Sequence, residues 1–556
     1  MENTGTFLTT LDFVVFFGSL LGVMALGLLA GRNESTSKDY FLAGRNVRWW
    51  GVAGSIFGSN ISANHMVGMM GVGFTLGFAE SHFEITAIAG LLLLCYCFLP
   101  VYRKLNIFTL SDYLSRRYDD KSRVAYSVIM ILIITMVMML PAFYIGSRSV
   151  NFLLVDQAQI NEVLKASAGG VAQTIEIDKT YYILGVLIMA LVTGVYTIVG
   201  GLKAVIVTDV LQSVLMLAGA LIVAWFTFNS VEIGGWDGMR ALDSKGKDLV
   251  HLYLPSDHPQ RPWSGMLSGL MVLHFYYWGA NQFIVQRALA AKTDKEARVG
   301  IITAGFVKLL IPFISIGTGI AAYYVFAERM PGVQVDGDTA FPLLLREVVA
   351  PAGVAGLVGL VAAGLIGAIL SSVDSMLNSA STLFTMDIYK RHIRPNADAH
   401  RIVRVGRMST AVFVILGCLL APFPARFEGV YEYMQLVWGF ISPAILPPRT
   451  TTIRSQMLRM SVNRWLTSRI DTPRDFNSKI ISQSLRIFSA ESAAVGSSIS
   501  NVDGSNCNAR ATATIWRSPP DNMPTSRSTS KSSPMLAMSS AAARVMALLS
   551  NTRIGP

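Results

Sequence analysis

Long apolar segments recur along the first 446 residues, and short polar loops separate them. Most segments are about 20 residues long, the length that an α-helix needs to cross a hydrocarbon layer of roughly 30 Å. They lack the alternation typical of a membrane-spanning strand, which excludes a barrel. The pattern therefore predicts an all-α, polytopic membrane protein. The expected spans are 11–30, 50–77, 83–102, 124–147, 181–199, 204–228, 265–286, 299–326, 353–386, 403–423 and 428–446.

Polar residues interrupt two of these spans near the middle. The second span contains GSNISANH at 58–65, and the seventh contains HFYYWGANQ at 274–282. Backbone that leaves helical form inside a membrane needs partners, so it survives only within protein or beside a wet cavity. Matched broken helices in two five-helix halves are typical of inverted-repeat secondary transporters. The plain alternative is that these polar residues only join neighbouring helices.

Composition excludes several classes of protein. Of the 556 residues, 52% are apolar and 15% charged, and the mean hydropathy is +0.47. An ordinary soluble domain has about 25% charged residues, so a soluble enzyme, a disordered chain and a disulfide scaffold are excluded. The four cysteines have no zinc or redox spacing. No nucleophile–base pair and no metal-ligand set occurs inside a span, so neither an enzyme nor a cofactor is expected.

The net charge of +11 is unevenly distributed. Residues 447–556 contain 14 Lys and Arg against 5 Asp and Glu, a net charge of +9, which leaves +2 for the first 446 residues. The basic balance is therefore no argument for nucleic-acid binding. Loops rich in Lys and Arg alternate with loops poor in them, and positive loops stay cytoplasmic. This alternation predicts a multi-pass protein of the plasma or bacterial inner membrane, with its N-terminus outside.

Several motifs resemble those of the sodium:solute symporter family, and within it the sodium–glucose cotransporter branch. The resemblance covers roughly residues 10 to 446. The matching segments are DYFLAGR (39–45), the broken segment at 58–65, GGLKAV (200–205), TDVLQ (208–212), YYWG (276–279) with Gln286 and Arg287, the Ser371-Ser372 pair, MLNS (376–379) and FTMDIY (384–389).

The resemblance implies a ten-helix core of two inverted five-helix repeats, preceded by one extra helix, that imports a small solute with sodium. It assigns five neutral oxygen ligands to the ion: the carbonyls of Gly58, Ile61 and Ala368 and the hydroxyls of Ser371 and Ser372. Neutral oxygens suit a hard cation that must leave in each cycle. For the serines, hydrogen bonding between helices is the structural alternative.

Two carboxylates lie close to this expected ion site. Asp209 lies inside a span, where a carboxylate is costly and a functional candidate. It is either a further sodium ligand or an acid near a helix N-terminus stabilised by the helix dipole. Asp374 lies two residues after Ser372, either near the ion exit or, as we expect, facing cytoplasmic water.

The solute site is expected among polar residues on different spans. A sugar offers many hydroxyl donors and acceptors, which Glu, Lys, Gln, Asn and His side chains can match. The resemblance assigns contacts with the sugar to Asn60, His65, Glu84, Lys308 and Gln435. It also gives Tyr277 and Trp278 a flat apolar face for the sugar ring, and it makes Tyr277 the inner gate. His274 and Asn64 differ from the pattern of the family, so the identity of the sugar stays open. The predicted solute-binding residues are Asn60, His65, Glu84, Tyr277, Trp278, Asn281, Lys308 and Gln435.

A monosaccharide such as glucose or galactose is the predicted solute. Inositol, sialic acid or an amino acid remains an alternative within transport, and Lys308 could then serve as a charge partner. A channel would conduct sodium without solute, whereas a sensor would bind solute without accumulating it. The predicted partners are sodium, the solute and the lipid bilayer.

The apolar pattern ends abruptly at Pro447. Residues 447–556 contain 21 Ser and no apolar run long enough to cross a membrane. Such a composition is typical of disordered segments. We expect a membrane transport domain at 1–446, whose last helix is cut short, and a basic tail at 447–556. One interpretation is a regulatory tail attracted to anionic lipid. Because the apolar pattern is lost in the middle of a helix, we favour the other, that the tail comes from a shifted reading frame or a gene fusion.

Overall fold

The computed structural model describes residues 7–32, 34–62, 64–154, 162, 178–333 and 335–422, and every structural statement below refers to these residues. They form helices joined by short loops, and their only β-type contacts are two isolated bridges. The predicted all-α class is confirmed. Seven continuous helical stretches are long and apolar enough to cross a membrane: Thr10–Ala30, Phe78–Lys104, Asp120–Leu154, Lys179–Phe228, Asp294–Arg329, Leu357–Ile393 and Ala399–Leu420.

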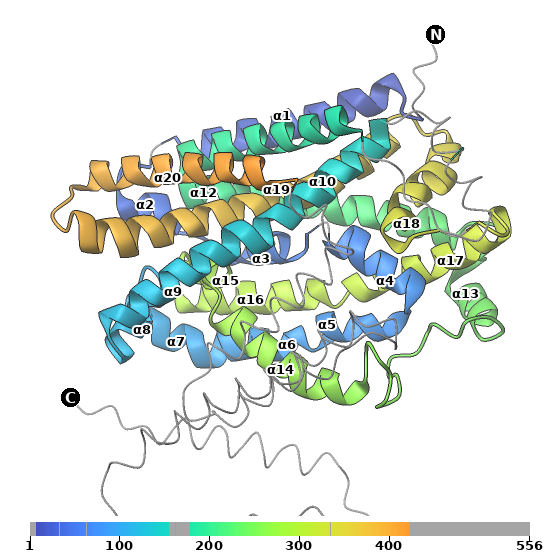
Figure 1. Ribbon diagram of the computed structural model, residues 1–556, viewed down its shortest axis with the longest axis horizontal. Coiled ribbons are helices and arrows are strands. Elements are labelled where there is room, and N and C mark those ends of the chain that lie inside the picture. The colour runs from blue at the N-terminus through green and yellow to red at the C-terminus, as the bar shows by residue number, and fades with distance from the viewer. Residues whose placement is uncertain are drawn as a thin grey trace, which may run out of the picture. The chain divides into compact units, whose positions relative to one another are not determined.

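The first half of the described chain carries α1 and the first broken helix (Figure 1). Its elements are α1 (Thr10–Ala30), α2 (Ser37–Leu42), η1 (Ala43–Arg45), α3 (Trp49–Asn60), η2 (Asn64–Gly68), α4 (Met69–Thr75), η3 (Phe78–Ser81), α5 (His82–Ile85), α6 (Ala87–Leu93), η4 (Leu94–Phe98), α7 (Leu99–Lys104), α8 (Leu110–Arg117), α9 (Asp120–Leu132), η5 (Ile133–Met138) and α10 (Met139–Leu154).

The second half carries the other broken helix and α19, which belongs to the most buried of the membrane-length stretches. Its elements are α12 (Lys179–Phe228), α13 (Gly235–Asp243), α14 (Trp263–Gly279), α15 (Gln282–Leu289), α16 (Asp294–Lys308), η6 (Pro312–Ile316), α17 (Gly317–Arg329), α18 (Gly337–Leu344), η7 (Leu345–Val349), η8 (Ala350–Ala352), α19 (Leu357–Thr382), η9 (Leu383–Ile393) and α20 (Ala399–Leu420). The short helices α2, α8, α13 and α18 were not predicted from hydropathy.

Both predicted helix breaks are present. Helix α3 ends at Asn60, Ile61 is extended (φ −81°, ψ 100°), and the helix resumes at Asn64. Helix α14 ends at Gly279, and α15 begins after an extended Asn281. The carbonyls freed at the second break accept hydrogen bonds from tyrosines: Tyr102 donates to Gly279 at 2.9 Å, and Tyr126 donates to Ala280 at 2.8 Å. The tyrosines thus provide the partners that irregular backbone needs inside a membrane.

Helix α12 combines two predicted spans, 181–199 and 204–228, around a kink at Gly201. Gly201 has a φ of +53°, and a Cβ atom there would lie 2.4 Å from the carbonyl oxygen of Tyr40. Only glycine fits both the left-handed conformation and this close approach. At 1.5 Å per residue, each arm of α12 is long enough to cross a hydrocarbon layer.

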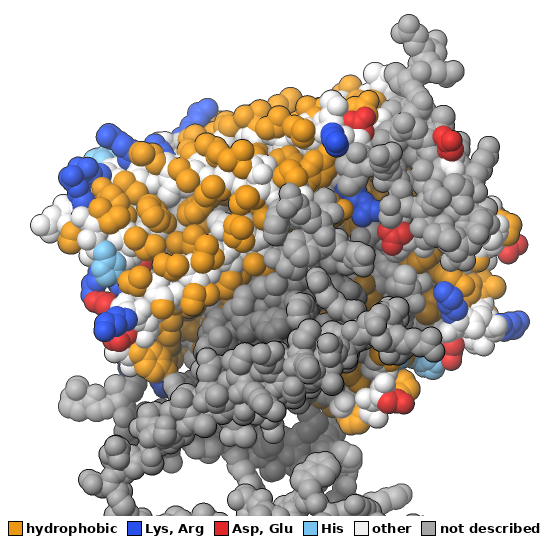
Figure 2. All heavy atoms as spheres, viewed as in Figure 1, with side chains coloured by type: hydrophobic (Ala, Val, Ile, Leu, Met, Phe, Trp, Pro, Cys, Tyr) orange, Lys and Arg blue, Asp and Glu red, His pale blue; other side chains and the backbone are white. Residues whose placement is uncertain are grey.

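The core forms where α12 packs against α19, α1, α3 and α10. Of the membrane-length part of the α19 segment, 89% is buried inside the protein, against 17% for α1. Where the described residues are visible in Figure 2, hydrophobic side chains form a broad area and charged side chains gather at its left and right ends. A lipid-facing belt between two polar ends is what a multi-pass membrane protein requires.

Candidate functional site

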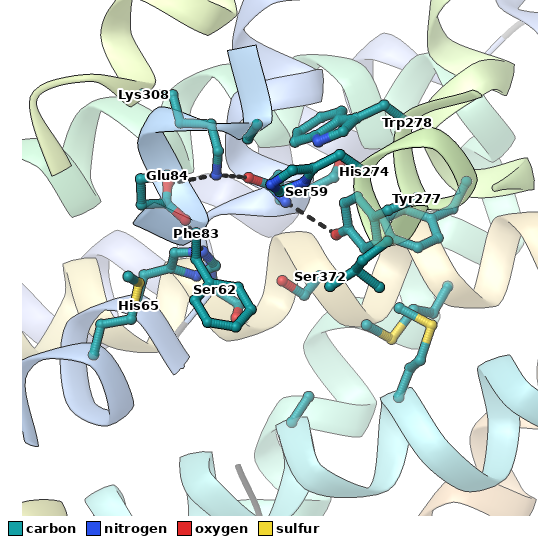
Figure 3. Close-up of a pocket in the computed structure, with 18 of the residues that line it drawn as sticks. Ser59, Ser62, His65, Phe83, Glu84, His274, Tyr277, Trp278, Lys308 and Ser372 are labelled. Carbon is teal, nitrogen blue, oxygen red and sulfur yellow. Dashed lines mark hydrogen bonds and ion pairs between the residues drawn. The ribbon is translucent and has the colours of Figure 1, made fainter. Parts of the chain in front are cut away.

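A cavity that contains a cluster of polar side chains lies where the first break meets α5, α14, α16 and α19. Its volume is about 130 Å³. Because a single water needs only roughly 10–15 Å³ of such space, the cavity can hold a small solute. In Figure 3, Lys308, Glu84 and His65 lie on one side of it, and Tyr277 and Trp278 on the other. The lining residues are Ser59, Asn60, Ser62, His65, Met69, Phe83, Glu84, Ala87, Met138, Ala142, Leu273, His274, Tyr277, Trp278, Phe283, Lys308, Ile369, Ser372 and Met376.

Lys308 connects the polar side chains on one side of the cavity. Its Nζ lies 2.5 Å from Glu84 Oε2 and donates to Asn60 Oδ1, also at 2.5 Å. The Nδ2 of Asn60 in turn donates to the hydroxyl of Tyr277 at 3.0 Å. Four predicted solute residues from four elements therefore form one hydrogen-bonded network. Lys308 and Glu84 are both buried, and a buried charge requires this kind of pairing.

The first break positions His65 in the same network. The backbone N–H of Ser62 donates to His65 Nδ1 at 3.1 Å, and His65 Nε2 lies 3.3 Å from Glu84 Oε1. Since Nδ1 accepts a hydrogen bond, Nε2 carries a hydrogen and can donate to the carboxylate. Glu84 is thus shared between His65 and Lys308.

The aromatic residues form the opposite wall. The rings of Tyr277 and Trp278 meet edge to face with centroids 5.2 Å apart, and Lys308 Nζ lies 5.5 Å from the centre of the Trp278 ring. Asn281 is buried at the second break, but it is not among the residues that line the cavity. Gln435 lies outside the described residues, as do Asn64's side chain and the last predicted span.

Four of the five predicted sodium ligands converge between α3 and α19. Ser371 Oγ donates to the Gly58 carbonyl at 2.8 Å and lies 3.0 Å from the Ala368 carbonyl oxygen, while Ser372 Oγ donates to Ala368 at 3.1 Å. Ile61, the fifth, is buried at the break. These neutral oxygens now bond one another, and they could turn to a cation without leaving a charge unpaired.

Asp209 lies in a second buried polar cluster beside this group. Its Oδ2 accepts from Ser55 Oγ at 2.5 Å and from Ser59 Oγ at 3.3 Å, and Arg287 lies 3.7 Å away. Its Oδ1 has no hydrogen-bond partner among the described residues. Asp209 lies more than two turns after the kink at Gly201, beyond the first turn in which a helix dipole acts.

The expectation that Asp374 faces cytoplasmic water was wrong. Asp374 is fully buried, and its Oδ2 accepts from the Tyr196 hydroxyl at 2.6 Å. Helix α12 packs along α19 and covers this face. Arg287, Ser59 and Ser375 lie between the carboxylates of Asp209 and Asp374. Arg287 donates to Ser375, and Ser59 Oγ lies 2.8 Å from Ser375 Oγ. The cluster of Ser55, Ser59, Arg287 and Ser375 was missed, although serines at i and i+4 within an apolar span are a detectable signal.

Two broken helices around a cavity, with neutral oxygens converging beside it, are typical of a secondary transporter. The chain belongs to the sodium:solute symporter family, whose sequence profile matches residues 40–453. The members it resembles are sodium-coupled transporters rather than enzymes, and sodium is the coupling ion of this class.

Two relatives show how far the similarity extends. The chain is 34% identical over 471 residues to the sodium/glucose cotransporter of Vibrio parahaemolyticus, covering 80% of this chain and 81% of the relative. It is 32% identical over 465 residues to sodium/myo-inositol cotransporter 2 of Rattus norvegicus, covering 78% of this chain and 65% of the relative.

A solved structure shares the fold. A sodium-coupled sialic acid symporter, captured in a substrate-bound outward-open state, superposes with a TM-score of 0.62 over 78% of this chain and 86% of that one. Its sequence identity is 24%, so this likeness concerns the fold alone.

Proposed function

We propose that this protein imports a monosaccharide, such as glucose or galactose, together with sodium by alternating access. The observation that carries the proposal is the Lys308–Glu84–Asn60–Tyr277 network around a cavity. These side chains offer donors and acceptors to hydroxyl groups, while Trp278 offers a flat apolar face. The sodium/glucose cotransporter of Vibrio parahaemolyticus, at 34% identity, supports a sugar as the solute.

Sodium would bind beside the cavity, on the other side of the first break. The carbonyls of Gly58, Ile61 and Ala368 and the hydroxyls of Ser371 and Ser372 are the proposed ligands, with Asp209 a further candidate. Ser59 contacts Asp209, and Ser59 and Ser372 both line the cavity. An ion here would thus act on the same helix break that presents Asn60 to the solute.

Inositol is a second candidate solute, because a relative at 32% identity is named a sodium/myo-inositol cotransporter. Inositol and a hexose both carry a ring of hydroxyl groups, so the same network could bind either. A sialic acid or an amino acid would add a carboxylate, which would compete with Glu84 for Lys308.

Residues 1–446 would form the transport domain, with the N-terminus outside and the Lys- and Arg-rich loops in the cytoplasm. Asn281 and Gln435 would complete the solute site. The basic tail after 446 would take no part in transport.

Uptake into reconstituted vesicles tests the proposal. With a sodium gradient imposed across the membrane, labelled glucose should accumulate, and unlabelled hexoses should compete while proline and acetate should not. A potassium gradient of equal size is the control for non-specific entry. If only an amino acid or an acid competes, the sugar assignment is wrong; if uptake ignores the sodium gradient, the coupling is wrong.

A further inference from the structure

His274 lines the cavity but belongs to neither proposed ligand set. It comes from α14, on the turn that precedes Tyr277 and Trp278, and its side chain is buried. Its Nε2 lies 2.8 Å from the hydroxyl oxygen of Thr86. Thr86 follows α5, which carries Glu84, so this contact joins two walls of the cavity.

The hydrogen of the Thr86 hydroxyl is already used. Thr86 Oγ1 donates to the carbonyl of His82, one turn earlier in the chain. A threonine hydroxyl has one hydrogen to donate, so towards His274 the Thr86 oxygen can only accept. His274 Nε2 must therefore carry the hydrogen of this bond. In the neutral ring, Nδ1 then bears a lone pair, and it has no hydrogen-bond partner among the described residues.

We propose that Thr86 is a positioning residue that holds His274 as its Nε2–H tautomer, so that the imidazole offers the cavity a hydrogen-bond acceptor and selects solutes with a hydroxyl donor at that point. The inference rests on the proposed function in taking the cavity as the solute site. It adds a requirement that the network around Lys308 does not impose, because a hydroxyl can donate to His274 whereas an ether or a fluorine cannot.

The tautomer can be measured without any solute. The full-length protein, reconstituted in lipid nanodiscs with ¹⁵N-labelled histidine, contains 7 histidines. The His274 signals are those that His274→Gln removes. Wild-type protein and Thr86→Ser should show a protonated Nε2, and Thr86→Val should show a mixture of both tautomers. A wild-type His274 protonated at Nδ1, or a tautomer unchanged in Thr86→Val, would overturn the proposal.

Thr227→Val is the matched control, because Thr227 Oγ1 makes the same kind of bond to a carbonyl one turn earlier, Val223, and within the described part of the chain it makes no hydrogen bond to a histidine. It should leave the His274 signals unchanged. A Thr227→Val spectrum that changes as much as that of Thr86→Val would show a general effect of losing a hydroxyl, and would also count against the proposal.

Competition by singly fluorinated glucoses then tests selection. At one ring position, replacing hydroxyl by fluorine should weaken competition about two- to tenfold in wild type and in Thr86→Ser, the range for one hydrogen bond. That penalty should shrink in Thr86→Val, because the freed ring can turn an N–H to the fluorine. Equal penalties in all three proteins would contradict the selection step. If glucose itself is not transported, the sugar assignment fails, while the tautomer measurement still decides the role of Thr86.

Discussion

Two buried ion pairs differ in how completely their polar atoms are paired. Asp387 lies in η9, directly after α19. It accepts hydrogen bonds from Arg123 at 2.6 and 3.1 Å, from Thr109 at 2.9 Å, from Ser127 at 2.7 Å and from Ser111. Arg123 also pairs with Asp112 at 2.7 Å. This cluster is closed, and no lining residue of the cavity belongs to it.

The Glu84–Lys308 pair is as deeply buried, yet it opens onto the cavity. Its partners His65 and Asn60 also line that space, as does Tyr277, which is bonded to Asn60. A buried charge costs free energy unless it is fully paired. The closed cluster therefore fits a role in holding helices together, whereas the open one retains groups that a solute can bind.

The largest expected effect is on stability, from opening the closed cluster. Asp387→Ala leaves the Arg123 guanidinium without its main partner, and breaking a buried pair in this way costs roughly 3–5 kcal/mol. We expect a much lower thermal unfolding temperature, followed by intrinsic fluorescence of the purified protein in detergent. The control is Arg391→Ala, which removes an exposed pair with Asp120 and should change little. Equal effects of the two variants would contradict a structural role for Asp387.

The next effect is on solute affinity, from altering the open cluster. Glu84→Gln keeps the shape of the side chain but removes the charge opposite Lys308. Losing hydrogen bonds in this desolvated site should cost about 1–3 kcal/mol, or roughly 5- to 150-fold in glucose affinity. Glu232→Gln, in a surface pair with Arg329 at 2.8 Å, is the matched control. Binding measured by titration calorimetry should fall only in the first variant; equal affinities would remove Glu84 from the solute site.

A smaller effect is expected at the proposed ion site. Ser372→Ala removes one of several neutral oxygens, so the sodium concentration for half-maximal uptake should rise about two- to tenfold. Ser381→Ala is the control on the same helix, since Ser381 donates to the Gly406 carbonyl at 2.8 Å and is remote from the break. If the sodium requirement of Ser372→Ala equals that of wild type, the ligand assignment is wrong.

The smallest effect is predicted for the tail. All the proposed solute and ion ligands precede residue 446, and the apolar pattern ends at Pro447. A chain ending at residue 446 should therefore bind glucose with unchanged affinity. A loss of binding would mean that residues 447–556 contribute to the glucose site.

Hydropathy predicted most of the described fold because lipid imposes long apolar helices on the sequence. It located both breaks, since GSNISANH and YYWGANQ interrupt otherwise apolar runs. It missed α2, α8, α13 and α18, which are too short to leave a membrane-length signal. It separated the two arms of α12 as the spans 181–199 and 204–228, but it could not show how the chain turns at Gly201, because that turn depends on contact with Tyr40.

The site was predictable where a polar residue stood out on an apolar span. Asn60, His65, Glu84 and Lys308 did so, and they come together around the cavity. The role of Thr86 was not predictable, because it depends on which atoms of His82 and His274 lie next to its hydroxyl. Asp374 was misplaced for a related reason: its neighbour Tyr196 is 178 residues away in the chain.

The central claim is that the open network binds sugar and that sodium beside the first helix break strengthens this binding. Titration of glucose into the purified wild-type protein, first in sodium and then in choline at equal ionic strength, tests it most directly. Because coupling between two sites is reciprocal, we expect an affinity about 5- to 150-fold higher in sodium, and a smaller ratio in Ser372→Ala. An affinity that is equal in the two salts would contradict the claim.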